Sequence, residues 1–164
     1  MSVSKIVIVI GASGSGKTTY IKNKYLTPEH LDTNPEKLIK CCSDGKTLLF
    51  GHYRINQRCC GCDTLSMGIL PALINFIPKI IDKYETIVFD GDRINCKRFF
   101  DFIKSLKNEV ELVLLSCPLS TSLARRQNTG SKASESFVRA TLTKSNNMAL
   151  YAQILGFKLI KINT

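Results

Sequence analysis

One short segment near the amino terminus limits the folds open to this chain. Residues 3–10, VSKIVIVI, form a nearly continuous β-branched run, which is typical of a strand buried on both faces of a parallel sheet. Glycine-rich residues 11–16 follow this run, and residues 17–25 fit a helix that ends before Pro28. A buried strand that turns through glycines into a helix indicates an α/β fold.

Strand and helix patterns alternate along the rest of the chain. β-type runs are expected at residues 38–42, 47–50, 86–90, 110–116 and 157–162, and helices at residues 68–81, 96–107, 119–127 and 134–155. Pro78 should kink or shorten the first of these helices. The alternation predicts one α/β domain over residues 1–164, with a parallel sheet of about five strands and helices on both faces. Residues 40–67 interrupt this alternation with a long polar stretch, and a long irregular loop in a compact domain is usually functional or mobile.

The glycine-rich turn carries a motif with known chemistry. Residues 11–18, GASGSGKT, match the pattern G-x-x-x-x-G-K-[ST] in full, between a strand and a helix as the mechanism requires. In such a P-loop the backbone N–H groups surround phosphate oxygens, the lysine reaches the β- and γ-phosphates, and the hydroxyl holds Mg²⁺. The alternative is a turn that only connects strand to helix. We expect a three-layer P-loop NTPase fold that binds ATP and Mg²⁺ through Gly11, Ser13, Gly14, Ser15, Gly16, Lys17, Thr18 and Thr19.

A carboxylate ends another apolar strand. Asp90 closes the run Thr86–Asp90, the usual Walker B position, where it could bind Mg²⁺ directly or through water. An aspartate after a strand is often only a turn former, but the P-loop favours the metal role for Asp90. Asp92 and Arg93 should lie at the same rim of the sheet.

Phosphoryl transfer also needs cations on the migrating phosphate. Arg125 and Arg126, on the helix expected at residues 119–127, are the best candidates, and Arg139 on the next helix is a further one. An exposed basic helix face is the alternative for each of them.

Several short motifs together resemble a known family. The P-loop, residues 89–93 (FDGDR) and residues 123–126 (LARR), in this order and spacing, resemble the small nucleotide-kinase-like branch of P-loop proteins over nearly the whole chain. Residues 51–54 (GHYR) and 61–67 (GCDTLSM) resemble a viral and phage subgroup that includes kinases acting on 5-hydroxymethyluracil in DNA. Residues 90–93 lack the proline of the adenylate-kinase Asp-Gly-x-Pro-Arg element, and no long glycine-rich lid insertion follows Arg126. The resemblance implies a kinase, and its subgroup implies DNA as the acceptor.

The charge of the chain agrees with an anionic acceptor. The net charge is +10, and residues 125–164 hold seven basic residues against one acidic residue. A basic surface attracts polyanions such as DNA, although a solvated surface without a specific partner is the alternative. Tyr53 could stack with an unstacked base, or it could simply pack beneath a loop.

The lining of the acceptor site is expected to come from a few charged residues: Asp44, Arg54, Asp63, Asp92, Arg93 and Arg139. Asp63 is the preferred general base, with Asp92 as the substitute if Asp63 proves to be a helix cap. Asp44, before Gly45, also suits a hairpin turn, and Asp32 suits helix capping.

Three functions remain open. The first is a kinase that transfers the γ-phosphate of ATP to a hydroxyl on DNA, with a hydroxymethylated pyrimidine as the acceptor. The second is a kinase for free nucleotides or another small metabolite, and the third is a nucleotide-dependent switch or binding ATPase. No Asn-Lys-x-Asp motif for guanine occurs in the chain.

Seven cysteines and the absence of a secretory signal indicate reduced thiols, and no run is long enough to span a bilayer. We therefore expect a cytoplasmic protein, in the host cell if it is viral, without a membrane partner. Cys59 and Cys62 form a C-x-x-C that could bind zinc with Cys41, Cys42 and His52, but unliganded thiols are the default expectation.

Overall fold

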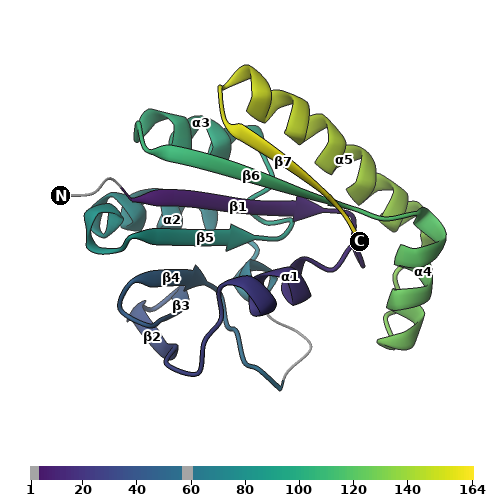
Figure 1. Ribbon diagram of the computed structural model, residues 1–164, viewed down its shortest axis with the longest axis horizontal. Coiled ribbons are helices and arrows are strands. Elements are labelled where there is room, and N and C mark those ends of the chain that lie inside the picture. Colours follow the sequence, from purple (N-terminus) through teal and green to yellow (C-terminus); the bar gives the residue numbers. More distant parts are fainter. Residues whose placement is uncertain (1–3, 57–60) are drawn as a thin grey trace.

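The computed structural model describes residues 4–56 and 61–164 (Figure 1). The strands are β1 (Lys5–Gly11), β2 (Leu31–Glu36), β3 (Ile39–Ser43), β4 (Thr47–Phe50), β5 (Thr86–Asp90), β6 (Glu109–Ser116) and β7 (Lys158–Asn163). The helices are α1 (Lys17–Lys24), α2 (Leu70–Phe76), α3 (Lys97–Ser105), α4 (Leu119–Asn128) and α5 (Glu135–Ile154). Short 3₁₀ turns lie at Cys62–Thr64, Ile77–Lys79 and Ile81–Lys83.

The strands form one mixed sheet in the order β2-β3-β4-β5-β1-β6-β7. β4, β5, β1, β6 and β7 run parallel to one another, whereas β3 is antiparallel to both β2 and β4. The α/β fold is therefore confirmed, but the sheet has seven strands rather than about five, and it is not wholly parallel.

β2 is the strand that the sequence did not predict. Its residues, LDTNPE, are mostly polar and mostly exposed, because β2 is an edge strand with only one neighbour. Proline is tolerated on such an edge, so Pro35 does not break the strand. Asp32, expected to suit a helix cap, lies in β2 instead.

Alternate residues of β1 face two different layers of helices. Ile6, Ile8 and Ile10 belong to one apolar core, which includes buried residues of α2, α3 and α5. Val7 and Val9 belong to a second core on the other face, beneath α1. The expected three layers are therefore present (Figure 1).

The helices differ from expectation mainly at their ends. The helix expected over residues 68–81 stops at Phe76 and continues as 3₁₀ turns, and Pro78 lies in the first of them, as its fixed backbone predicts. α5 begins after Ser134, whose hydroxyl accepts from the Phe137 N–H. Within the part of the chain that the structure describes, no helix is both long and apolar enough to cross a membrane.

The sheet brings the carboxyl ends of β1 and β5 together. β1 and β5 are parallel neighbours, and Val9 is paired with Asp90. The turn that follows Gly11 and the carboxylate of Asp90 therefore lie at the same edge of the sheet.

Candidate functional site

The turn between β1 and α1 leaves the start of the helix open. Gly16 is the N-cap residue of α1, and no side chain caps this helix. The first N–H groups of a helix have no partner inside the helix, so they can bind an anion at this point. Thr18 and Thr19 lie in this first turn, whereas Ser15 is buried and its N–H donates to the Ala12 carbonyl at 3.0 Å.

Helices α4 and α5 pack against the outside of the turn. Gly14 has a φ of +85°, and a Cβ atom on it would lie 2.7 Å from the carbonyl oxygen of Ser122 in α4. Only glycine fits this position, because a side chain would meet the backbone of the neighbouring helix. The Ser13 N–H donates to Thr141 Oγ1 of α5 at 3.0 Å. The turn is therefore held in one shape by two elements distant in sequence.

The Lys17 side chain folds back over the turn. Its Nζ donates to the carbonyl oxygens of Gly11 and Ala12, each at 3.0 Å. Burial lowers the pKa of Lys17, and the negative charge of Asp90 opposes this effect. Asp63 and Asp92 act on the Lys17 charge in the same direction as Asp90, and Arg126 acts against it. The charges of four expected site residues thus act on one lysine.

Asp90 is almost completely buried, with 2% of its surface exposed. Its Oδ1 atom accepts hydrogen bonds from the Tyr53 hydroxyl at 2.5 Å and the Cys62 N–H at 2.9 Å. Burial raises the pKa of Asp90 to about 6, although both hydrogen bonds favour the ionised form. The carboxylate is therefore oriented before any ligand arrives.

Two chain segments close over Asp90, and we call residues 51–53 and 61–64 the clasp. The Gly61 N–H donates to the His52 carbonyl at 2.8 Å, and the Thr64 hydroxyl donates to the Gly61 carbonyl at 2.6 Å. The His52 N–H donates to Thr64 Oγ1 at 3.2 Å. These bonds tie the exit of β4 to the turn at Cys62–Thr64.

Asp63 and Asp92 lie beside one another next to Asp90. Asp63 Oδ1 accepts from the Asp92 N–H at 3.1 Å and lies 3.9 Å from Arg93 Nη1. Asp92 in turn pairs with Lys144 of α5 at 3.0 Å. The Asp63 side chain is 50% exposed. No side chain caps the Cys62–Thr64 turn or α2, so the helix-cap alternative for Asp63 is wrong.

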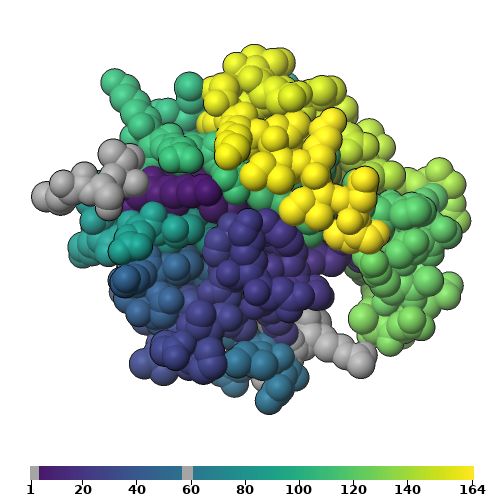
Figure 2. Space-filling view, viewed as in Figure 1, coloured from purple at the N-terminus to yellow at the C-terminus, as the bar shows by residue number. Residues whose placement is uncertain are grey.

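Arg125 and Arg126 reach the turn from α4. Arg125 Nη1 donates to the Gly14 carbonyl at 3.3 Å and to Thr164 Oγ1 at 3.2 Å. The Arg126 guanidinium donates to the hydroxyls of Ser13 and Ser131. Figure 2 shows the surface hollowed between α4 and the region of the turn and α1. The two arginines are near the turn as expected, and their role in chemistry stays a prediction.

Two of the expected acceptor residues lie elsewhere. Asp44 is in the β3–β4 turn, where its Oδ1 accepts from the N–H groups of Lys46 and Thr47 at 2.9 and 2.7 Å. Thr47 pairs with Thr86 at the start of β5, whereas Asp90 ends that strand, so Asp44 and Asp90 lie at opposite ends of the parallel strands. The assignment of Asp44 to the acceptor site is therefore wrong. Arg139 pairs with Glu135 at 2.7 Å on an exposed face of α5, which is the arrangement that the alternative interpretation described.

Tyr53 does not form a base-stacking surface. It is 4% exposed, and its ring packs in the core beneath α1 with Leu49 and Val88, so the packing alternative is correct. Arg54 binds Asp32, with Nη2 3.2 Å from Oδ2.

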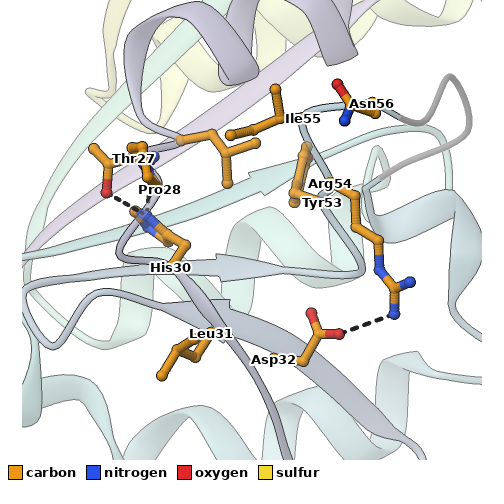
Figure 3. A pocket seen from close by; sticks show the side chains of 10 residues that line it. Thr27, Pro28, His30, Leu31, Asp32, Tyr53, Arg54, Ile55 and Asn56 are labelled. Carbon is orange, nitrogen blue, oxygen red and sulfur yellow. Dashed lines mark hydrogen bonds and ion pairs between the residues drawn. The ribbon is translucent and has the colours of Figure 1, made fainter.

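A cavity of about 440 Å³ lies next to this ion pair (Figure 3). Its lining residues are Leu26, Thr27, Pro28, His30, Leu31, Asp32, Tyr53, Arg54, Ile55 and Asn56. Leu26 to Pro28 follow the carboxyl end of α1, and a helix of eight residues is about 12 Å long. The cavity therefore lies near the carboxyl-terminal end of α1, and Tyr53, which donates to Asp90, forms part of its wall.

The zinc hypothesis finds no support in the described residues. Cys59 lies outside them, and among residues 4–56 and 61–164 no three His, Cys, Asp or Glu side chains are grouped to hold a metal ion. Cys41, Cys42 and Cys62 are buried, and Cys41 and Cys62 are free thiols. The oxygen atoms of Thr18 and Asp90 are ligands of the kind that Mg²⁺ prefers. Because Mg²⁺ keeps several bound waters, the buried Asp90 carboxylate can hold the ion through one of these waters.

Sequence reasoning missed the contacts that hold the site together. These contacts join residues far apart in the sequence, so no sequence motif marks them. They are made by the Tyr53 hydroxyl and the Cys62 N–H to Asp90, by Thr141 to Ser13, and by Lys144 to Asp92. Gly51 and Gly61 are the sequence feature that could have indicated the close contact between these two segments. Both have positive φ, and a Cβ atom on Gly51 would lie 2.1 Å from the Gly61 carbonyl oxygen.

The chain has a distant structural likeness among known proteins. No family model matches the chain, and no curated protein matches it. Among solved structures, an unliganded sugar kinase from Janibacter sp. HTCC2649 is similar, with 18% sequence identity and a TM-score of 0.44, over 98% of this chain and 85% of that chain. A likeness of this size identifies neither a family nor a substrate for this chain.

Proposed function

We propose that this protein is an ATP- and Mg²⁺-dependent phosphotransferase that moves the γ-phosphate of ATP to a hydroxyl group. The observation that carries the proposal is the set of charges around Lys17. This lysine lies in a P-loop with an uncapped helix start, beside the end of β5 that carries Asp90. Arg126 donates to Ser13 of the same loop, and Asp63 accepts from the Asp92 N–H. Cations for a triphosphate, a carboxylate for a metal and a second carboxylate for an acceptor are thus gathered at one sheet edge.

Each residue has a role that follows from its place. The N–H groups at the start of α1 and the Lys17 ammonium bind the triphosphate, in place of the carbonyl contacts that Lys17 now makes. Thr18 and Asp90 hold Mg²⁺, which neutralises the phosphate charge when bound. Arg125 and Arg126, beside Gly14 and Ser13, stabilise the oxygens of the migrating phosphate.

Asp63 is the proposed general base. It is half exposed, next to Asp92 and Arg93, so an acceptor hydroxyl can reach it while the buried Asp90 serves the metal. A carboxylate that orients a hydroxyl and takes its proton contributes about 10²- to 10⁴-fold to a rate.

We propose a nucleic acid as the acceptor, with a 5-hydroxymethylpyrimidine base in DNA as the substrate. The net charge of +10 supports this choice, because it adds a salt-dependent attraction for a phosphate backbone. A small free acceptor, such as a nucleotide, is the second candidate. The mixed-charge group of Asp63, Arg93, Asp92 and Lys144 favours it, because a small polar molecule can bind there without a long groove.

Incubation with γ-labelled ATP and a panel of acceptors tests these proposals. The panel contains hydroxymethyluracil DNA, hydroxymethylcytosine DNA, ordinary DNA and free deoxynucleotides, each with and without Mg²⁺. Label in hydroxymethylated DNA supports the first candidate, and label in free nucleotides supports the second. Label found only as inorganic phosphate indicates a switch ATPase and contradicts phosphotransfer to a hydroxyl.

A further inference from the structure

The clasp covers the carboxylate that the proposed function assigns to the metal. A Cβ atom placed on Gly61 would lie 2.4 Å from Oδ1 of Asp90 and 2.6 Å from Oδ2. The Gly61 backbone therefore lies directly against the carboxylate, and its φ of +94° is a conformation that glycine adopts without strain. No larger residue fits here while Asp90 keeps its place.

The two hydrogen bonds that the clasp donates to Asp90 converge on one oxygen. Tyr53 comes from the segment after β4, and Cys62 from the turn that follows Gly61, yet both donate to Oδ1. A carboxylate held by two donors from different segments loses the rotation about its Cα–Cβ and Cβ–Cγ bonds that a free side chain has. The Tyr53 ring is fixed in turn by the core beneath α1.

We propose that Tyr53 is a positioning residue for Asp90, whose hydroxyl keeps the carboxylate in a single orientation for the magnesium–nucleotide complex. The inference rests on the proposed function, since it assumes that Asp90 serves a metal. Partners of this kind orient metal-binding carboxylates in other proteins, and their removal costs about 10- to 100-fold in metal affinity or activity. The competing explanation is that the bond only satisfies two buried polar groups.

The test compares metal retention in five proteins. Mn²⁺, which substitutes for Mg²⁺ and is detected by electron paramagnetic resonance, is titrated into each protein with a non-hydrolysable ATP analogue. The proteins are the wild type, Tyr53→Phe, Asp90→Asn, the double variant Tyr53→Phe/Asp90→Asn and the control Tyr25→Phe. Tyr25 packs against the same apolar core as Tyr53 but has no bond to Asp90 among the described contacts, so its substitution removes a hydroxyl without touching the carboxylate.

We expect Tyr53→Phe to weaken Mn²⁺ binding by about 10- to 100-fold, and Tyr25→Phe to leave it unchanged. The double variant Tyr53→Phe/Asp90→Asn should bind Mn²⁺ no more weakly than Asp90→Asn alone, because Tyr53 acts only through Asp90. In turnover, Tyr53→Phe should lower kcat and leave KM for the acceptor unchanged. A Tyr53→Phe variant that melts at a lower temperature but binds Mn²⁺ like the wild type would overturn the proposal.

If Tyr53→Phe does not fold, a measurement on the wild type tests the proposal instead. Hydrogen exchange of the Cys62 amide should stay slow when Mg²⁺ and the ATP analogue bind, because the clasp keeps its bond to Asp90. Fast exchange in that complex would refute the positioning role. Mn²⁺ retention that needs both Asp90 and Tyr53, in a protein without transfer activity, would instead contradict the proposed phosphotransfer and support the positioning role.

Discussion

Replacing Asp90 with asparagine is expected to stabilise the folded protein while it damages the metal site. The carboxylate is 2% exposed, and burial raises its pKa from 3.8 to about 6. One pKa unit corresponds to about 1.4 kcal/mol, so ionised Asp90 costs the folded state about 3 kcal/mol at neutral pH. Asparagine has a carbonyl oxygen that can accept the same bonds from Tyr53 and Cys62, but it carries no charge.

The sign of the pH dependence follows from the direction of this shift. The folded protein keeps the Asp90 proton up to about pH 6, whereas the unfolded chain releases it near pH 3.8. The stability that the protonated group contributes is therefore complete below pH 3.8 and is lost as the pH rises to about 6. The advantage of Asp90→Asn should grow over this range and stay constant above it.

Denaturation by urea and by heat, from pH 4 to pH 8, measures this advantage. For a chain of this size, about 3 kcal/mol corresponds to a rise in melting temperature of roughly 6 to 12 °C at pH 8. The Asp90 pKa of about 6 already includes the effect of the Lys17 charge, which opposes the rise caused by burial. A difference between variant and wild type that does not change with pH, or a less stable variant at pH 8, would refute the reasoning.

Three other substitutions separate the site from the scaffold. Asp63→Asn should keep the fold and the hydrogen bond from the Asp92 N–H, but it should slow phosphoryl transfer from labelled ATP by about 10²- to 10⁴-fold. A lower melting temperature with a normal transfer rate would show that Asp63 has a structural role. Arg126→Ala should lower the single-turnover rate by about 10²-fold, and an unchanged rate would remove Arg126 from the chemistry. Asp44→Ala should cost about 1 kcal/mol in urea denaturation, from two lost turn bonds, and leave transfer unchanged; slower transfer would contradict its place at the far sheet edge.

The sequence predicts best where local pattern and chemistry coincide. The β-branched run before Gly11 and the glycines after it define strand, turn and helix within twenty residues, so β1 and α1 were expected at nearly their observed bounds. Asp90 was expected at the end of β5 because an apolar run precedes it. Its position beside the turn needed only the rule that parallel neighbours end at the same edge.

Features that depend on distant contacts could not be read from the chain. β2 is polar because it is an edge strand, and nothing local separates it from a loop. Asp44 and Asp63 look alike in sequence, yet the antiparallel β3–β4 hairpin takes Asp44 to the opposite edge. For Tyr53 the sequence left base stacking and packing beneath a loop open, and it gave no sign that the hydroxyl donates to a buried carboxylate 37 positions away.

Titration with a non-hydrolysable ATP analogue, followed by calorimetry in the presence of Mg²⁺, tests the central claim that the turn at residues 11–18 binds the triphosphate of ATP. The wild type should bind the analogue, and binding should weaken sharply without Mg²⁺. Lys17→Ala should lose most of the affinity while its circular dichroism spectrum stays that of the wild type, because the hydrogen bonds described for Lys17 go to carbonyl oxygens of its own turn. Equal binding by the two proteins, or no binding by the wild type, would contradict the claim.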